Sequence, residues 1–125
     1  MRVLITGGSG RLGYSVTQRL SAGGCEVISI DRRRDDRLEV QQITVDVTDP
    51  GQVWSVMARC KPDAVVHLAA IAIPFSAAES EIFRTNTLST FTVIEAAIGV
   101  GVPRILTATS PTAIGYGARE GWMMG

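Results

Sequence analysis

The chain has 125 residues, of which 46% are hydrophobic and 19% charged, and its formal net charge is zero. This length fits one domain with one core, and the balanced charge gives no electrostatic basis for binding nucleic acid or an anionic membrane. Cys25 and Cys60 have neither metal-site nor redox-pair spacing, and no export leader or membrane-spanning run is present, so we expect a cytoplasmic protein without a bound metal.

The first predicted element is a strand, because residues 3–5 are apolar. Three glycines follow, at Gly7, Gly10 and Gly13, and amphipathic helix material continues to Leu20. Strand, glycine turn and helix in this order are typical of a dinucleotide fingerprint: the first glycine permits a sharp turn, the second lets the backbone approach a pyrophosphate, and the third lets the helix pack on the sheet. The unpaired amides of the first helical turn would then face the phosphates. By itself, this pattern could be no more than a turn.

A second signal comes from the strand predicted at 26–30, which ends in Asp31, 18 residues beyond Gly13. An acid near this spacing accepts hydrogen bonds from the adenosine ribose, and a carboxylate there would repel a 2′-phosphate. We therefore predict a dinucleotide site that prefers NAD to NADP. Arg32 weakens the preference, because it could pair with that phosphate. The arginines at 32–34 are offset by two aspartates, and we expect a solvated loop.

Helices and strands alternate through the rest of the chain. Leu12, Val16 and Leu20 recur at helical spacing and should face the sheet. The later elements are predicted as a strand at 42–47, a helix with Asp49 as N-cap and Pro50 at its first position, a strand at 64–70, a long helix from about 77 to 100 and a strand at 104–110. The buried face of the middle helix should comprise Val53, Val56, Met57 and Cys60.

This alternation predicts an α/β fold of Rossmann type, a doubly wound parallel sheet with strand order 3-2-1-4-5 that is truncated after the fifth strand. Residues 1–125 would form one dinucleotide-binding domain, with the ligand at the carboxyl ends of the strands. The helix at 77–100 is more apolar than contact with the sheet requires, so we expect it to contact something else as well.

Five motifs in this order resemble the amino-terminal part of an extended short-chain dehydrogenase/reductase of the NAD-dependent epimerase/dehydratase family. They are Thr6-Gly7-Gly8-Ser9-Gly10-Arg11-Leu12-Gly13 with Asp31, then Asp46-Val47, Asp63-Ala64-Val65-Val66-His67-Leu68-Ala69-Ala70, Asn86 and Ala108-Thr109-Ser110. The turn at 109–116 is similar to that of the hexuronate dehydrogenases, although Pro111 and Thr112 depart from the residues usual there. The resemblance covers essentially the whole chain.

The resemblance implies a set of cofactor-binding residues. Asp31 would bind the adenosine ribose, Asp46 and Val47 would flank adenine, and residues 68–70 would line the path to the nicotinamide ribose. Asn86 would support the loop between strand and helix, or else be only a helix-surface amide. The full implied set is Gly7, Gly10, Arg11, Leu12, Gly13, Asp31, Arg32, Asp46, Val47, Leu68, Ala69, Ala70, Asn86 and Thr109.

The resemblance also separates two residues that could do chemistry. His67 is not catalytic in the family's segment, and a lone histidine in an apolar strand is typical of a satisfied core residue. Ser110 is the candidate catalytic residue, because in the family this hydroxyl hydrogen-bonds the substrate oxygen whose charge changes as hydride moves. The alternatives are that Ser110 belongs to ordinary strand-exit chemistry, or that Thr112 is the relevant hydroxyl.

One family feature is missing from this sequence. The proton-transfer unit of the family is Tyr-x-x-x-Lys. Four residues after Tyr116 this sequence has Glu120, and four residues after Tyr14 it has Gln18. Lys61 is the only lysine in the sequence. We therefore expect the chain to be the cofactor-binding part of a longer enzyme whose substrate-binding region is absent.

Two functions stay open. The chain is either part of an oxidoreductase or epimerase that moves hydride to or from a sugar-like alcohol, or a catalytically inert dinucleotide-binding module. We also expect a homodimer, or self-association, through the helix at 77–100.

Overall fold

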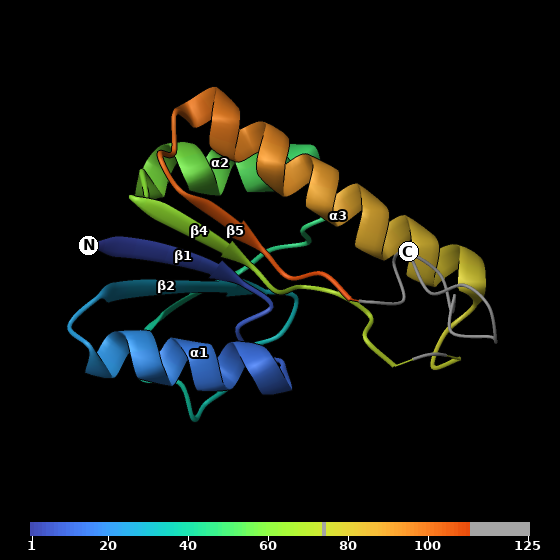
Figure 1. The fold of residues 1–125 in the computed structure, drawn as a ribbon, viewed down its shortest axis with the longest axis horizontal. Helices are drawn as coiled ribbons and strands as arrows, with labels where there is room; N and C mark the ends of the chain where they lie inside the picture. The colour runs from blue at the N-terminus through green and yellow to red at the C-terminus, as the bar shows by residue number, and fades with distance from the viewer. Residues whose placement is uncertain (74, 111–125) are drawn as a thin grey trace, which may run out of the picture.

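In the computed structural model, which describes residues 1–73 and 75–110, five parallel strands form one sheet in the order β3-β2-β1-β4-β5 (Figure 1). The predicted α/β class and strand order are therefore confirmed. The elements are β1 (Arg2–Thr6), α1 (Arg11–Ala22), β2 (Glu26–Asp31), β3 (Gln41–Thr44), α2 (Pro50–Cys60), β4 (Ala64–His67), α3 (Glu79–Val100) and β5 (Ile105–Thr107).

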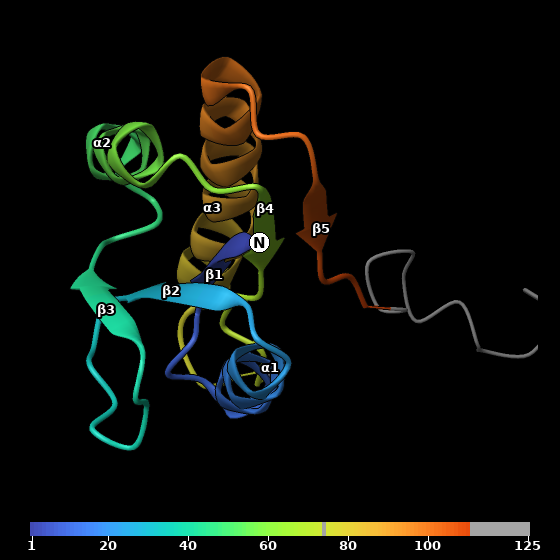
Figure 2. The same ribbon diagram turned by 90° about the vertical axis from the view of Figure 1, so that its left-hand side faces the viewer.

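The helices cover both faces of the sheet. Figure 2 shows α1 on one side and α2 with α3 on the other. Along β1, Leu4 faces the larger core beneath α2 and α3, whereas Val3 and Ile5 face the smaller core beneath α1. Residues on both faces of β1 are therefore buried, as is usual for parallel strands that are covered on both faces.

The helix α1 packs on the sheet through Val16 and Leu20, as predicted, but not through Leu12. Gly13 and Thr17 are buried, Val16 packs against the smaller core, and Leu12 is 58% exposed, so the prediction that Leu12 faces the sheet is wrong. Because Gly13 has no side chain, the helix backbone approaches the preceding turn at that residue, and the contact stripe is centred one position later than Leu12.

The helix α2 agrees with its prediction. The Asp49 carboxylate caps its first turn by accepting a hydrogen bond from the Gln52 amide at 3.1 Å, and Pro50 occupies the first helical position. Its predicted apolar face is buried: Val53, Val56, Met57 and Cys60.

The strands β3, β4 and β5 end three residues earlier than predicted, at Thr44, His67 and Thr107. In each case the predicted segment continues past the last paired residue, so composition alone does not mark the boundary. The backbone after β3 and β4 leaves the sheet and forms walls at its carboxyl edge. Among the described residues, no helix is long and apolar enough to cross a membrane.

Candidate functional site

A cavity of about 420 Å³ opens at the carboxyl ends of β1, β2 and β4. Eight residues predicted to bind a cofactor line it: Gly7, Gly10, Asp31, Arg32, Val47, Leu68, Ala69 and Ala70. Five further lining residues were missed by sequence reasoning: Ser9, Arg33, Val45, Ile71 and Thr85. Each of these lies directly beside a predicted residue in the chain, so proximity to a motif was the available signal for them.

The glycine turn forms the floor of this cavity. Gly7 has φ +72°, and a side chain there would lie 2.7 Å from the Ala69 backbone, so both the turn and the contact with the β4 loop require glycine. A Cβ on Gly13 would lie 1.9 Å from the Gly7 carbonyl oxygen. The predicted role of Gly7 in the turn is confirmed, whereas the close approach at Gly13 is to the turn backbone at Gly7 and Gly8.

Gly10 occupies the remaining position of the turn and is exposed. Its backbone is extended, with φ −77° and ψ 168°, and no side chain caps the amides at the start of α1. A Cβ at this position would meet only the Gly7 oxygen, at 3.2 Å. The space beside Gly10 is therefore left open toward the cavity, where the first-turn amides could bind an anion.

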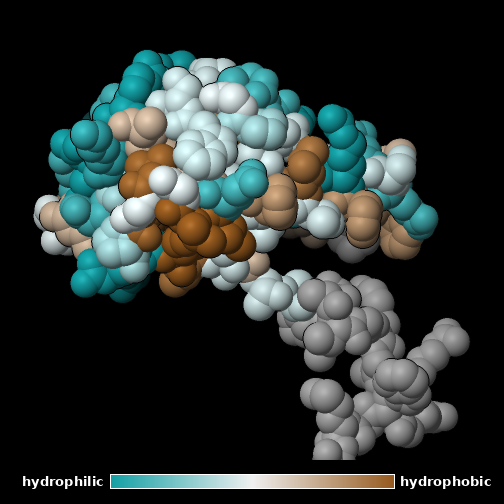
Figure 3. Space-filling model, turned by 90° about the horizontal axis from the view of Figure 1, so that it is seen from above, coloured by the Kyte–Doolittle hydropathy of each residue, from teal (hydrophilic) through white to brown (hydrophobic). Residues whose placement is uncertain are grey.

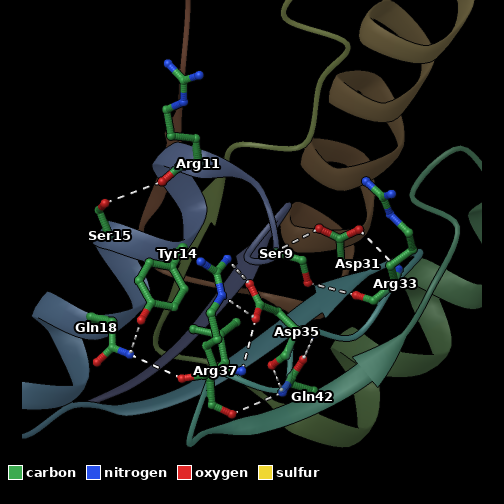
Figure 4. Close-up of polar contacts among 11 residues, drawn as sticks. Ser9, Arg11, Tyr14, Ser15, Gln18, Asp31, Arg33, Asp35, Arg37 and Gln42 are labelled. Atoms are coloured by element: carbon green, nitrogen blue, oxygen red, sulfur yellow. Dashed lines mark hydrogen bonds and ion pairs between the residues drawn. The ribbon is translucent and has the colours of Figure 1, made fainter.

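Asp31 is held at the edge of the cavity by the backbone of two loops. Its Oδ2 accepts a hydrogen bond from the Ser9 amide at 3.2 Å, and its Oδ1 accepts one from the Arg33 amide at 3.3 Å. The Ser9 hydroxyl donates to the Arg33 carbonyl at 2.8 Å and joins the two loops (Figure 4). Each carboxylate oxygen keeps further acceptor capacity, which is what hydroxyls of a bound ribose would need.

The segment after β2 is solvated as predicted at Arg32, Arg33 and Arg34, which are exposed, and it contacts α1 a few residues later. Arg37 stacks over the Tyr14 ring at 4.5 Å and pairs with Asp35 at 2.6 Å (Figure 4). The Asp35 pKa is lowered to about 2, chiefly by the side-chain hydrogen bond from Arg37. The Gln42 amide donates to the Asp35 carbonyl at 2.9 Å. The stacking of Arg37 on Tyr14 joins residues far apart in sequence, and local spacing does not predict it.

Asp46, predicted to flank adenine, does not line the cavity. Its side chain contacts Thr48 and Arg32 instead. Its Oδ1 accepts hydrogen bonds from the Thr48 amide at 2.9 Å and hydroxyl at 2.7 Å, and the Thr48 amide is the main cause of its lowered pKa. Nη2 of Arg32 lies 3.5 Å from the same oxygen. The guanidinium is thereby drawn toward Asp46.

Asn86 lies behind the cavity wall and fastens the loop that follows β4. Its Oδ1 accepts from the Ile71 amide at 2.8 Å, and its Nδ2 donates to the Ile71 carbonyl at 3.1 Å. This two-way contact supports the loop between strand and helix, and the alternative of a helix-surface amide is wrong.

His67 is 3% exposed, and burial lowers its pKa. Its Nδ1 lies 2.7 Å from the Thr6 hydroxyl, and its Nε2 lies 3.1 Å from the Thr90 hydroxyl. The prediction of a satisfied core histidine is confirmed.

The remaining predicted residues do not line the cavity. Arg11 and Leu12 are exposed in the first turn of α1, Thr109 and Ser110 are exposed after β5, and Gly13 is buried under the turn. Thr112, Tyr116 and Glu120 fall outside the described residues. A second hollow, of about 500 Å³, lies at the amino ends of the strands beside Arg2 and Glu26, away from the glycine turn.

Comparison with known proteins adds an independent finding. A model of the NAD dependent epimerase/dehydratase family matches residues 3–121. The chain is 32% identical over 127 residues to a UDP-glucose 4-epimerase of Azospirillum brasilense, covering 95% of this chain and 36% of that protein. It is also 32% identical over 120 residues to a uronate dehydrogenase of Agrobacterium fabrum, covering 92% and 43%.

A solved structure agrees with these sequence matches. The UDP-glucose 4-epimerase of Thermus thermophilus in complex with NAD has a TM-score of 0.76 and 30% sequence identity, covering 84% of this chain and 36% of that one. The chain therefore spans less than half the length of each of these relatives.

Proposed function

The chain belongs to the NAD-dependent epimerase/dehydratase family, and we propose that it forms the NAD-binding part of an enzyme that moves hydride between nicotinamide and an alcohol carbon of a sugar or sugar nucleotide. One observation carries this proposal: Gly7 and Gly10 of the glycine turn line the same cavity as Asp31, at the carboxyl edge of the sheet, and Asp31 lies 18 residues beyond Gly13. The named relatives supply the substrate class, since they include a UDP-glucose 4-epimerase and a uronate dehydrogenase.

Within this proposal, different residues bind different parts of the dinucleotide. The pyrophosphate lies over Gly10 and the first turn of α1, where Arg11 and Leu12 flank it. The adenosine ribose binds Asp31, and adenine lies against Val47, with the Asp46 backbone beside it because the Asp46 side chain is bound to Thr48. The nicotinamide-side ribose follows residues 68–70.

The chemistry falls to the far end of the dinucleotide, after β5. There the Ser110 hydroxyl would act as the catalytic group that binds the substrate oxygen, with Thr109 beside the cofactor. NAD supplies the hydride acceptor when it is bound.

The preference for NAD follows from the Asp31 carboxylate, which would repel a 2′-phosphate. Arg32 would have to leave Asp46 before pairing with that phosphate, which favours NAD further. In calorimetric titrations of the 125-residue chain, we expect NAD to bind at least about tenfold more tightly than NADP, the effect of one like-charge contact of about 1.4 kcal/mol. Asp31→Asn should narrow this ratio, whereas Asp36→Asn, an exposed change in the same loop, should not. Tighter binding of NADP by the wild type would contradict the proposal.

A catalytically inert dinucleotide-binding module is the second candidate, and the position of Lys61 favours it. Lys61 caps the C-terminus of α2 next to the amino end of β4, at the sheet edge opposite the cavity. It is therefore poorly placed to serve as the family's catalytic lysine. Measurable oxidation of a uronate or sugar nucleotide by the purified 125-residue chain with NAD would exclude the inert module.

We further propose that α3 is the surface through which the chain forms a homodimer. Phe83, Phe91 and Ile98 are 71%, 61% and 66% exposed along this helix. Figure 3 looks down on this side of the molecule and shows hydrophobic atoms gathered at the surface, most densely toward the β5 edge. Exposed apolar area of this kind favours association.

Sedimentation velocity tests the α3 surface. Phe91→Glu should shift the chain toward monomer, whereas Ile73→Glu, at an equally exposed loop residue, should leave association unchanged. A wild-type chain that stays monomeric at high concentration would contradict the dimer.

We also propose that the protein works in a reducing compartment such as the cytoplasm, since Cys25 and Cys60 are free thiols.

A further inference from the structure

We propose that His67 is a positioning residue for the dinucleotide: its neutral imidazole orients the Thr6 hydroxyl and, together with Asn86, holds segment 68–71 in the shape that forms one wall of the cavity. This inference rests on the proposed function, because segment 68–71 is where we place the nicotinamide-side ribose. It assigns His67 a role that is neither catalysis nor simple core filling.

The hydrogen-bond roles around Thr6 are fixed by counting donors. The Thr6 Oγ1 accepts from the Ala69 amide at 3.1 Å and from the Leu68 amide at 3.2 Å, and the Leu68 amide is shared with the Thr6 carbonyl oxygen at 3.1 Å. A hydroxyl has two acceptor sites and one hydrogen. With both acceptor sites engaged, the hydroxyl hydrogen points at Nδ1 of His67, 2.7 Å away. Nδ1 is then an acceptor, and the imidazole carries its hydrogen on Nε2.

The other side of the ring gives the same tautomer. Nε2 of His67 lies 3.1 Å from Oγ1 of Thr90, which itself donates to the Asn86 carbonyl at 2.8 Å. Thr90 therefore has no hydrogen for His67 and must accept one from Nε2. The Asn86 amide then binds both the amide and the carbonyl of Ile71. The chain of hydrogen bonds thus starts at Leu68 and Ala69 and returns to the same loop at Ile71.

This loop has little freedom to move without changing the cavity. A Cβ on Gly7 would lie 2.7 Å from the Ala69 backbone, so the loop packs directly on the glycine turn. Leu68, Ala69 and Ile71 all line the cavity. A displaced loop would therefore alter the wall toward nicotinamide, while Asp31, on the far side, would keep its own backbone contacts.

Protonation of His67 conflicts with this arrangement. A hydrogen on Nδ1 would face the Thr6 hydroxyl hydrogen, and three donors would then compete for its two acceptor sites. The other groups that contact the ring are the hydroxyls of Ser89 and Thr90, and Thr107 is its strand neighbour on β5. Burial is the one cause of its lowered pKa. The charged residues of α3, all exposed, are Glu79, Glu81, Arg84 and Glu95.

The sign of the pH effect follows. Because the folded chain disfavours the charged ring, the unfolded chain binds a proton first as pH falls below the ordinary value of 6.5, so the folded state loses stability in that range. Dinucleotide binding requires the same neutral ring, and it should weaken at a lower pH, where the ring of the folded chain itself takes up a proton.

The test compares NAD with AMP, which has the adenosine end but no nicotinamide ribose. Wild type, His67→Leu and His67→Asn are titrated with each nucleotide between about pH 4.5 and 8, a range that extends well below the ordinary histidine pKa. Leucine fills the space without accepting a hydrogen bond, whereas the asparagine Oδ1 can stand in for Nδ1. Loss of one well-placed hydrogen bond should weaken NAD binding by His67→Leu about tenfold and AMP binding by less than about twofold.

Asparagine should restore most of the NAD affinity. Wild-type NAD affinity should fall only at a pH clearly below 6.5, where the buried ring takes up a proton, while that of His67→Asn stays flat. The wild-type pH profile against AMP needs no variant and remains informative even if His67→Leu unfolds. Parallel changes for NAD and AMP, or a flat wild-type profile, would overturn the positioning role. Failure of the wild type to bind either nucleotide would instead overturn the proposed function, and this inference with it.

Discussion

Gly10→Val and Gly13→Ala form a matched pair of variants. The first should block the binding of a ligand, and the second should disturb the packing of the fold. A side chain at Gly10 would meet only the Gly7 oxygen, with its Cβ at 3.2 Å, and the extended backbone there suits any residue. A Cβ at Gly13 would lie 1.9 Å from the same oxygen and 2.7 Å from its carbonyl carbon. Both obstacles at Gly13 are backbone atoms, which cannot rotate away.

The two variants should therefore change stability by different amounts. For Gly10→Val, the reduced freedom of the unfolded chain, about 0.4–1 kcal/mol, offsets the tight contact, and the net change should stay within about 1 kcal/mol. Gly13→Ala should cost about 1–3 kcal/mol or more, the range for overpacking a closed contact. Urea unfolding of both variants and the wild type measures this difference.

Gly10→Val should weaken NAD binding strongly, although it should change the stability of the fold very little. The valine side chain would keep the pyrophosphate from the amides at the start of α1. Losing one hydrogen bond to a charged group, about 1.5–3 kcal/mol, weakens NAD binding about 10- to 150-fold. Calorimetric titration with NAD provides the measurement. A Gly10→Val chain that binds NAD like the wild type would refute the assignment of the pyrophosphate to this turn.

Three further predictions concern packing, charge and capping. Gly99→Ala should destabilise the fold by about 1–2 kcal/mol, because the new methyl would lie 1.9 Å from the Trp54 ring, and in a Trp54→Ala background it should instead stabilise by up to about 1 kcal/mol, as seen by thermal unfolding. Lowering the pH from 3.8 toward about 2 should protonate Asp35 and release Arg37, with the Arg37 side-chain NMR signals shifting in that range and staying constant above it; a shift centred near 3.8 would contradict the pairing. Asp49→Ala should cost about 0.5–2 kcal/mol through loss of the α2 cap, and Asp49→Ser should recover most of it in the same assay.

The fold could be predicted from sequence because its signals are local. Each glycine of the turn, each apolar run and the Asp49-Pro50 pair marks an element within a few residues. Boundaries were less accurate where apolar composition runs on past the last paired residue, as after His67. Leu12 was misplaced because the helical stripe was located by hydrophobicity, whereas a missing side chain at Gly13 sets the closest approach.

The candidate site was predictable to the extent that its residues are near a motif. Ser9 and Arg33 lie beside Gly10 and Asp31, but their joint hold on the Asp31 carboxylate depends on two loops meeting in space. The stacking of Arg37 on Tyr14 has the same origin. Such contacts follow from the tertiary fold, and spacing in one sequence carries no record of them.

The central place of β1 also has a consequence for how the chain folds. The pairing of β1 with β2 joins residues about 25 positions apart in the sequence. The pairing of Thr6 in β1 with His67 in β4 joins residues 61 positions apart. Contacts of high sequence separation form against a larger loss of chain entropy, and they slow folding. The half of the site made by the glycine turn and Asp31 should thus be complete in an early species, before the wall from segment 68–71 is in place. In a refolding experiment, recovery of affinity for AMP should therefore precede recovery of affinity for NAD.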